Sequence, residues 1–550
     1  MSGMSGMSGL GAPQAPFAIG LDLGTSGVKA VLLSADGQLL AEATAPLAVS
    51  RPQPLRSEQD PADWLTAVHR AMAALREQAD PAQWQQVRAL AAAGQMHGAV
   101  LLDAQGRVLR PAILWNDGRC QAECDALEAR EPATRRITAN RAMAGFTAPK
   151  LMWVARHEPA VFAQVAKVLL PKDWLVLQFT GQYSSEMSDA AGTLWLDVAK
   201  RQWSLPMLAA SGMRLDQMPA LHEGPDAVGA LLPRCCQAWG LPAQVQMAAG
   251  AGDNAGGAVG VGVVRPGDAL LSLGTSGVIF VATAGPQANP ERGVHTFCHA
   301  WPDTWHQMAV MLSASSALSW WCGITGAEPA ALLASLAVGG VRAAAPIFLP
   351  YLSGERTPHA DPGATGSFHG LTHAHGRDDL SYAVLEGVAF AFADGLAALQ
   401  ERPQTALPPA PEGAAPSGQA TLAQERPQAD DKRRPPPEGD ESSGQATFAH
   451  EAGSRPARLL AIGGGARSDV WLQLLADVLN VPIARPAGAE VGPALGAARL
   501  ALLSLGLDRA TVVTPPPIAQ SFEPTPANRA ALQARLARYR AAHAPLRALS

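Results

Sequence analysis

The sequence predicts a mixed α/β protein built from two large, similar halves. At 550 residues the chain is too long for one hydrophobic core, because single cores stop growing at roughly 250–300 residues. Strand-like and helix-like segments alternate along most of the chain. The pentapeptide Leu-Gly-Thr-Ser-Gly occurs twice, at Leu23–Gly27 and again at Leu273–Gly277. This repetition in matching surroundings indicates that the two halves are related.

The first half begins with short apolar segments that are typical of strands. We expect strands over Ile19–Leu23, Ala30–Leu33 and Val87–Ala92, which are apolar runs close to turn-forming residues. We expect a helix over Pro61–Gln78, because Asp60 is a typical N-cap and proline fits the first helical position.

The second half follows a glycine-rich stretch at Gly250–Gly262. We expect helices over Leu380–Leu399 and Val470–Leu479, and a strand over Arg458–Ile462. The predicted domains are residues 17–262 and 263–545.

Each copy of the pentapeptide lies between two apolar runs, which predicts a tight turn at the tip of a β-hairpin. The glycines allow a ligand to approach the backbone closely, and the N–H groups and hydroxyls can donate to phosphate oxygens. An ordinary hairpin turn is the alternative, but such turns need no identical sequences. We therefore interpret both tips as phosphate-binding loops that grip one polyphosphate. The residues assigned to them are Gly24, Thr25, Ser26, Gly27, Gly274, Thr275, Ser276 and Gly277.

Two acidic residues stand beside glycine-rich segments. Asp22 directly precedes the first pentapeptide, where bound phosphates would repel a carboxylate unless a cation such as Mg²⁺ lies between them. Asp253 and Asn254 lie in a stretch of glycine and alanine, and a carboxylate in such surroundings suits a general base that accepts a hydroxyl proton. The alternatives are a turn former for Asp22 and a helix N-cap for Asp253.

Two further segments combine polar groups or glycines with strand ends. Gln95 and His97 follow a predicted strand and can hydrogen-bond the hydroxyls of a ligand, although a lone histidine is more often structural. Ile462–Asp469 carries consecutive glycines between a predicted strand and a helix. Such glycines would let a flat ring such as adenine lie on the backbone, and a tight turn is the alternative.

Composition and motifs argue against several other functions. A net charge of −5 argues against a broad surface for nucleic acids or anionic membranes. The six cysteines show neither zinc spacing nor a disulfide framework, so we expect reduced thiols. Metal binding by Cys120 and Cys124, or by His373 and His375, is a minor alternative. No apolar run reaches membrane-spanning length, and Ala248–Val264 comes closest.

Two segments fall outside the α/β pattern. Residues 1–16 begin with a Met-Ser-Gly triplet repeat and lack the charged and apolar regions of a signal peptide, so we expect a disordered tail. Residues 402–456 are rich in proline and repeat short phrases such as Glu-Arg-Pro-Gln. Such a segment cannot bury enough apolar surface to fold, which predicts a disordered insert within the second domain.

Together the motifs resemble the FGGY carbohydrate kinases of the actin/hexokinase/Hsp70 ATPase superfamily. The family patterns fit Gly145–His157, Gly366–Leu371 and Asp379–Glu386, and the resemblance runs from Phe17 to the end of the folded chain. Within the family, further stretches resemble the members that act on D-xylulose, and glycerol kinases carry a different polar pair at the position of Met96 and His97. These stretches are Ala93–Gly98, Ile113–Arg119, Pro171–Asp173, Ser188–Thr193 and Leu349–His359.

The resemblance implies two ribonuclease-H-like domains around a central cleft that holds ATP and sugar. It implies a cytoplasmic enzyme of xylose catabolism that transfers the γ-phosphoryl group of ATP to O5 of D-xylulose, with ATP and Mg²⁺ as cofactors. By matching positions, Asp253 is the expected general base. Asp22 keeps the role of metal-side carboxylate that its place beside the first loop predicts. The matched sugar contacts are Met96, His97, Asp253 and Asn254, and the matched adenosine residues are Gly464, Gly465 and Asp469.

Three alternatives remain open. A sister kinase would act on another ketose, polyol or sugar acid. An actin-like or chaperone-like ATPase would have no small acceptor, and the pairs Met96–His97 and Asp253–Asn254 argue against it. A catalytically inactive sugar sensor is disfavoured by the intact Asp22 and Asp253. The expected partners are the sugar and ATP alone, without nucleic acid or membrane, and a homodimer is left open.

Overall fold

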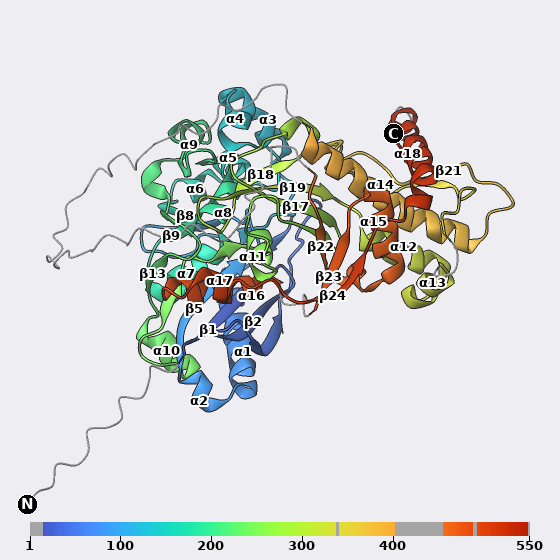
Figure 1. Ribbon diagram of the computed structural model, residues 1–550. Coiled ribbons are helices and arrows are strands. Elements are labelled where there is room, and N and C mark those ends of the chain that lie inside the picture. The colour runs from blue at the N-terminus through green and yellow to red at the C-terminus, as the bar shows by residue number, and fades with distance from the viewer. Residues whose placement is uncertain (1–14, 337–339, 402–454, 488–491, 548–550) are drawn as a thin grey trace, which may run out of the picture.

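The computed structural model describes residues 15–336, 340–401, 455–487 and 492–547, and shows two α/β lobes side by side (Figure 1). The predicted tail over residues 1–16 and the predicted insert over 402–456 lie outside the described residues, apart from two residues at one end of each. The statements below concern the described residues.

The first lobe is built on a mixed β-sheet. In spatial order its strands are β13 (Ala227–Ala230), β14 (Gln246–Ala248), β5 (Val87–Gly94), β1 (Phe17–Leu23), β2 (Gly27–Ser34) and β3 (Leu39–Pro46). Strands β1, β2 and β3 are antiparallel neighbours, whereas β5 runs parallel to β1 and β14 parallel to β5. The short strand β15 (Ala251–Gly252) also pairs with β5.

The second lobe repeats this arrangement. In the matching order its strands are β24 (Ile518–Phe522), β23 (Ile483–Pro486), β22 (Leu459–Ile462), β16 (Ala269–Leu273), β17 (Gly277–Thr283), β19 (Trp305–Met311) and β18 (His295–Cys298). Strand β16 is antiparallel to β17 and parallel to β22, as β1 is to β2 and β5. Strand β18 has no counterpart along the first sheet, but the order and direction of the other strands agree, so the prediction of two related α/β halves is confirmed.

The predicted first helix has the expected bounds. Helix α1 (Pro61–Gln78) begins after Asp60, whose side chain accepts a hydrogen bond from the backbone N–H of Ala62 at 2.9 Å. Its apolar stripe, which includes Trp64 and Val68, is buried against β2 and β3. The N-cap and the helical spacing of apolar residues therefore account for both the position and the packing of this helix.

Two predicted helices form much of the core of the second lobe. They are α14 (Arg377–Gln400) and α15 (Asp469–Leu479), which pack against each other. By length and composition α14 could cross a membrane, so the expectation that no segment reaches that length is wrong for this helix. However, 94% of its apolar window is buried inside the protein, which is the environment of a core helix.

One helix late in the chain belongs to the first lobe. Helix α16 (Gly492–Ser504), red in Figure 1, packs on the blue strands β1 and β2 and against α11 (Asp253–Gly260). The two helices cross closely, because a Cβ atom on Gly496 would lie 1.8 Å from the backbone oxygen of Gly256. The predicted division at residues 262 and 263 assigns α16 to the second domain, whereas its contacts lie in the first lobe.

The remaining elements connect and cover the two sheets. In the first lobe they are β4 (Glu58–Gln59), α2 (Pro81–Trp84), β6 (Val100–Leu102), β7 (Ala112–Ile113), α3 (Gln121–Arg130), α4 (Thr134–Thr138), α5 (Thr147–His157), α6 (Pro159–Phe162), β8 (Lys167–Leu169), α7 (Pro171–Thr180), β9 (Ser184–Glu186), α8 (Met187–Ala190), β10 (Leu196–Asp197), β11 (Gln202–Trp203), α9 (Leu205–Ala210), β12 (Ala220–His222), α10 (Pro233–Trp239) and α17 (Arg509–Val512). In the second lobe they are α12 (Ser315–Thr325), α13 (Pro329–Leu336), β20 (Ile347–Leu349), β21 (Ser367–His369) and α18 (Arg529–Arg547).

Candidate active site

The first pentapeptide forms the tip of the β1–β2 hairpin, as predicted. The backbone N–H of Gly24 donates to the carbonyl of Gly27 at 2.9 Å, which closes the turn. The hydroxyl of Thr25 donates to the side-chain oxygen of Gln95 at 3.0 Å and accepts from the indole N–H of Trp115 at 2.9 Å. The loop is therefore tied to the segment that follows β5 and carries His97. Ser26, at the outer point of the turn, is exposed.

The second pentapeptide forms the tip of the β16–β17 hairpin. Its backbone is held by the segment that begins α12: the N–H of Ser315 donates to the carbonyl of Gly274 at 2.9 Å, and the N–H of Ala314 to that of Thr275 at 3.0 Å. Ser276 and Gly277 complete the turn. Both hairpin predictions are confirmed, whereas their phosphate-binding role stays a prediction.

The predicted adenosine segment lies directly against the second pentapeptide. A Cβ atom on Gly463 would lie 2.9 Å from the carbonyl carbon of Leu273, and one on Gly465 would lie 2.5 Å from the side chain of the same leucine. Gly463 also has a φ of +91°, which glycine adopts without strain. Two motifs almost two hundred positions apart are thus in contact.

The other two adenosine residues differ in their surroundings. Gly464 is exposed, and a Cβ atom there would meet nothing within 4 Å, so its backbone face is open. Asp469 is exposed at the start of α15, but its carboxylate accepts from Arg485 at 2.7 Å and from Gln520 at 3.2 Å. These contacts, mainly the hydrogen bond from Arg485, lower the pKa of Asp469.

The two predicted acidic residues lie close enough to interact electrostatically. Burial, and secondly the charge of Asp253, raise the pKa of Asp22 to about 7, while Lys29 opposes the shift. Burial raises the pKa of Asp253 to about 6, and hydrogen bonds from Asn254 oppose it. Those bonds reach one carboxylate oxygen of Asp253 from the backbone N–H at 2.7 Å and from the side-chain amide at 2.9 Å.

The structure bears on the two alternative roles, a turn former for Asp22 and a helix N-cap for Asp253. The N-cap of α11 is Gly252, and Asp253 occupies the first helical position instead. Oδ1 of Asp22 is buried without a hydrogen-bond partner among the described residues. A buried carboxylate oxygen without a donor fits a cation, and Mg²⁺ prefers such oxygen ligands.

His97 is held by three contacts to the protein. Its Nδ1 lies 2.6 Å from the carbonyl oxygen of Gly192, so Nδ1 carries the proton and Nε2 remains an acceptor. Its own carbonyl accepts hydrogen bonds from Nζ of Lys150 at 2.7 Å and from the hydroxyl of Thr147 at 3.0 Å. Burial lowers the pKa of His97 to about 3, so the ring is neutral at any physiological pH.

Glycines bring the predicted sugar residues next to the predicted base. A Cβ atom on Gly252 would lie 3.0 Å from Cγ of Met96, and one on Gly192 would lie 2.6 Å from Nδ1 of His97. Gly252 directly precedes Asp253. The structure therefore places Met96 beside the N-terminus of α11, where Asp253 and Asn254 lie, and places Gly192 against both Met96 and His97.

Lys150 is a residue that sequence reasoning did not assign. It is fully buried in α5, and burial lowers its pKa to about 7. Its hydrogen bond fixes the carbonyl of His97, a residue with a φ of +68° that favours glycine. The sequence signal that could have identified Lys150 is its place as a lysine among mostly apolar residues in the family pattern Gly145–His157.

Arg356 was also missed, and it comes from the second lobe. Its guanidinium lies 3.1 Å from Nε2 of His295, and its charge contributes to the low pKa of His97. His295 in turn contacts the side-chain oxygen of Asn140 at 3.1 Å, which belongs to the first lobe. A cation from the second lobe thus lies near the predicted sugar residues of the first.

A buried polar cluster supports the strand that leads to Asp253. Ser188 accepts a hydrogen bond from the backbone N–H of Gly252 at 3.0 Å. Next to it, Asp189 and Lys172 are completely buried, and Lys172 forms an ion pair with Asp173 at 2.6 Å. Burial raises the pKa of Asp189 well above its usual range.

The minor metal alternatives find no support among the described residues, where no group of three His, Cys, Asp or Glu side chains could hold an ion. The six cysteines form no disulfide bonds.

Comparison with known proteins identifies the sequence family. Residues 17–260 match the N-terminal domain, and residues 269–505 the C-terminal domain, of the FGGY family of carbohydrate kinases. The xylulose kinase of Escherichia coli (strain K12) is 50% identical over 525 residues, which cover 95% of this chain and 97% of that protein. The xylulose kinase of Klebsiella pneumoniae is 48% identical and covers 92% and 94%. A crystal structure from Brucella ovis, described as a xyloylose kinase, has a TM-score of 0.85 at 46% identity and covers 97% and 100%.

Proposed function

The chain belongs to the FGGY family of carbohydrate kinases, and we propose that it transfers the γ-phosphoryl group of ATP to O5 of D-xylulose. The assignment of D-xylulose as the substrate rests on the 50% identity to a xylulose kinase over nearly the whole of both chains. The placement of Met96 against Gly252, which directly precedes Asp253, supports it, because Met96, the neighbouring His97 and Asp253 are the residues expected to contact the sugar and the reacting hydroxyl.

Sugar recognition is assigned to the neutral ring of His97. Since Nδ1 donates to Gly192, Nε2 is the atom that accepts a hydrogen bond from a sugar hydroxyl. The buried side chain of Met96 supplies an apolar contact next to it. Burial, with smaller contributions from the charges of Lys150 and Arg356, lowers the pKa of His97 and keeps the imidazole neutral, so the ring stays an acceptor.

Proton removal is assigned to Asp253. A pKa of about 6 leaves the carboxylate mostly ionised at neutral pH, yet closer to the operating pH than an ordinary aspartate. Asn254 occupies Oδ1 with both of its donors, so Oδ2 is the oxygen assigned to accept the proton of the hydroxyl.

Nucleotide binding is assigned to the two pentapeptide loops and to Gly464 and Gly465. Asp22, with one buried oxygen that has no donor, is the residue assigned to hold Mg²⁺. When bound there, Mg²⁺ would neutralise the charge that develops on the phosphates during transfer. The contact between Gly463 and Leu273 would keep the adenosine side and one phosphate loop in fixed register.

The two lobes are proposed to close around both substrates. Closure of a two-lobe kinase excludes water and completes the site from residues of both lobes. Arg356 and the second pentapeptide come from the second lobe, whereas His97, Asp253 and the first pentapeptide come from the first.

A substrate panel tests the proposal directly. ATP consumption should be measured against D-xylulose, other pentuloses, polyols, aldoses and sugar acids, with mass spectrometry of the phosphorylated product. We expect the highest kcat/KM with D-xylulose and a phosphate on O5. A higher kcat/KM with another acceptor would make the protein a sister kinase, and ATP turnover without any acceptor would favour a plain ATPase.

A further inference from the structure

A cavity of about 680 Å³, here called the hinge pocket, lies where the chain crosses between the lobes. Most residues of the segment 262–269, which connects α11 to β16, form one part of its wall. Residues of 513–518, which connect α17 to β24, form another. The hinge pocket is therefore lined by two of the connections that any relative movement of the lobes must bend.

The hinge pocket lies at the opposite ends of the elements that carry the candidate active site. Asp253 begins α11, whereas Gly262 follows its end, and a helix of eight residues is about 12 Å long. The second phosphate loop follows the end of β16, whereas Ala269, its first residue, lines the pocket. Likewise, Arg458 precedes β22, and Gly463 follows that strand.

The wall of the hinge pocket is rich in positive charge. Arg265, Arg458 and Arg509 line it, and none of them forms an ion pair with an acidic residue that the structure describes. Asp268 is the acidic residue of this wall, and its carboxylate caps the local turn by accepting from the backbone N–H of Arg265 at 2.9 Å. The guanidinium of Arg509 lies over the ring of Trp301, 5.2 Å from its centroid.

A fourth arginine lies behind this wall. Arg499 is 4% exposed and donates to the backbone oxygens of Val259 at 3.0 Å and Thr514 at 2.7 Å, and Thr514 lines the pocket. Its Nε is buried without a partner among the described residues. Burial lowers its pKa to about 10, which still leaves the group charged. A buried cation that lacks an acidic partner adds to the positive potential of the pocket.

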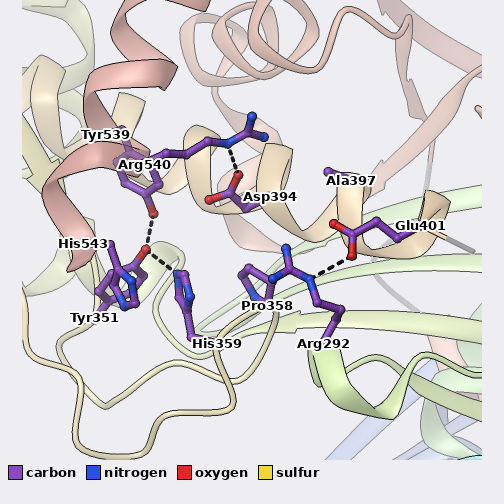
Figure 2. Close-up of a pocket in the computed structure, with 10 residues that line it drawn as sticks. All are labelled: Arg292, Tyr351, Pro358, His359, Asp394, Ala397, Glu401, Tyr539, Arg540 and His543. Carbon is purple, nitrogen blue, oxygen red and sulfur yellow. Dashed lines mark hydrogen bonds and ion pairs between the residues drawn. The ribbon is translucent and has the colours of Figure 1, made fainter. Parts of the chain in front are cut away.

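A second cavity in the molecule shows the opposite arrangement. Figure 2 shows a pocket of about 310 Å³ in the second lobe, in which each arginine faces an acid. Arg540 contacts Asp394 at 2.6 Å, and Arg292 contacts Glu401 at 2.9 Å. The cations of that pocket are neutralised by its own side chains, whereas no described acid forms an ion pair with Arg265, Arg458 or Arg509 of the hinge pocket.

We propose that the hinge pocket binds a small phosphate-bearing anion between Arg458 of the second lobe and Arg509 of the first. Guanidinium groups bind phosphate oxygens through paired, charge-assisted hydrogen bonds. The volume leaves room for a phosphate ester of a small sugar beside Trp301, which lines the pocket. The stacking of Arg509 on Trp301 limits the freedom that its side chain loses on binding.

Binding at this place opposes closure of the active site. The two lobes turn about the connections between them, so closing the cleft on one side separates the lobes on the other. An anion held by arginines of both lobes therefore stabilises the open arrangement. This consequence rests on the proposed function, because phosphoryl transfer is the step that needs closure, whereas the binding itself does not.

Direct binding tests the site independently of activity. Isothermal titration with inorganic phosphate and with ribose 5-phosphate, at constant ionic strength, should be compared in three proteins. These are the wild type, the double variant Arg458→Gln/Arg509→Gln, and the control Arg51→Gln/Arg70→Gln, which removes two charges from exposed positions elsewhere. We expect the double variant to weaken binding by about tenfold or more, the value of lost hydrogen bonds to a charged group.

The outcomes separate clearly. Equal affinity in the wild type and the double variant would overturn the site, as would an equal loss in the control. Tighter binding of ribose 5-phosphate than of inorganic phosphate would identify an ester as the ligand, and equal binding would identify the free anion.

Kinetics test the coupling to closure. We expect both anions to inhibit the wild type in a manner not competitive with ATP, and this inhibition should disappear in the double variant while its uninhibited rate stays unchanged. Inhibition that is competitive with ATP and equal in the two proteins would place the anion at the nucleotide site and overturn the coupling. If the wild type phosphorylated no sugar even in the absence of added anion, the proposed function would be wrong. The titration would still test whether the hinge pocket binds the anion.

Discussion

At the residue scale, the chemistry of the site depends on buried groups whose charge or proton position is set by neighbours. Asp22 and Asp253 repel each other, and burial keeps the ring of His97 neutral. Lys150 is buried and donates a hydrogen bond to the carbonyl of His97. The acids and the histidine could be predicted, because each stands in a short motif. Lys150 and Arg356 could not, since their importance comes from contacts with His97 and His295 that the sequence does not show.

Replacing Asp253 by Asn should remove the proposed base with little change in shape. We expect kcat to fall by roughly 10²–10⁴-fold, the usual value of a positioned general base. In the wild type, kcat should fall as the pH drops through about 6, because only the ionised carboxylate accepts a proton. A pH profile of kcat on folded protein checks both points. A variant that keeps a near-normal kcat would contradict the assignment.

Replacing Asp22 by Asn should weaken the binding of the Mg²⁺ on which the rate depends. The reason is that the variant loses the buried carboxylate charge that the cation is expected to neutralise. Titration of activity with Mg²⁺ at saturating ATP measures this, and the midpoint should move to higher concentration. Superimposable titration curves would return Asp22 to the role of a turn former.

Replacing Lys150 by Met should impair sugar binding more than ATP binding. The variant removes one of the two donors to the carbonyl of His97, the one at 2.7 Å, and the loss of such a hydrogen bond costs about 1–3 kcal/mol. A loss of that size corresponds to a rise in the KM for sugar of roughly 5- to 150-fold. Lys200→Met, at an exposed ion pair, is the matched control. If the KM values for sugar and ATP rise together, Lys150 has a general structural role.

At the element scale, glycine decides how closely the elements approach. The predicted hairpins agree with the structure because the glycine-rich tips and the flanking apolar runs are local signals. The bounds of α1 agree for the same reason. The close crossing of α11 and α16 could not be predicted, since Gly256 and Gly496 lie far apart in the sequence.

Replacing Gly496 by Ala should strongly destabilise the first lobe. The added methyl group would lie 1.8 Å from the backbone oxygen of Gly256, so the helices must move apart. Overpacking of this kind costs typically about 1–3 kcal/mol. Thermal unfolding should show a clearly lower Tm than in Gly285→Ala, where the added atom meets nothing within 4 Å. Equal Tm values would mean that the two helices can separate without cost.

At the scale of the whole molecule, the duplicated sheet explains why one repeated pentapeptide was so informative. The loop occurs at the same place in each half because strand order and direction are the same in both sheets. What could not be predicted is the return of the chain to the first lobe at α16, which follows β23 of the second lobe. That return depends on long-range packing against β1 and α11, for which the sequence carries only a pattern of small residues.

Deleting residues 403–455 and joining the ends with a short Gly/Ser turn should leave a folded and active kinase. The deleted sequence is rich in proline, internally repeated and almost free of core-forming side chains. Shortening a loop from about 60 to about 10 residues favours the folded state by roughly 1.6 kcal/mol in the ideal-chain estimate. The helix before it, α14, keeps its own core contacts, and the strand after it, β22, keeps its pairing with β16 and β23.

The comparison needs the Tm and kcat/KM of the deletion variant beside those of the parent, together with limited proteolysis of the parent. We expect an equal or higher Tm, an unchanged kcat/KM, and cleavage of the parent within the deleted sequence, because unpaired exposed backbone is cut first. A deletion variant that fails to fold, or a parent that resists cleavage there, would show that these residues contribute contacts to the second lobe. In that case, a segment whose composition is typical of disorder would contain a structural element.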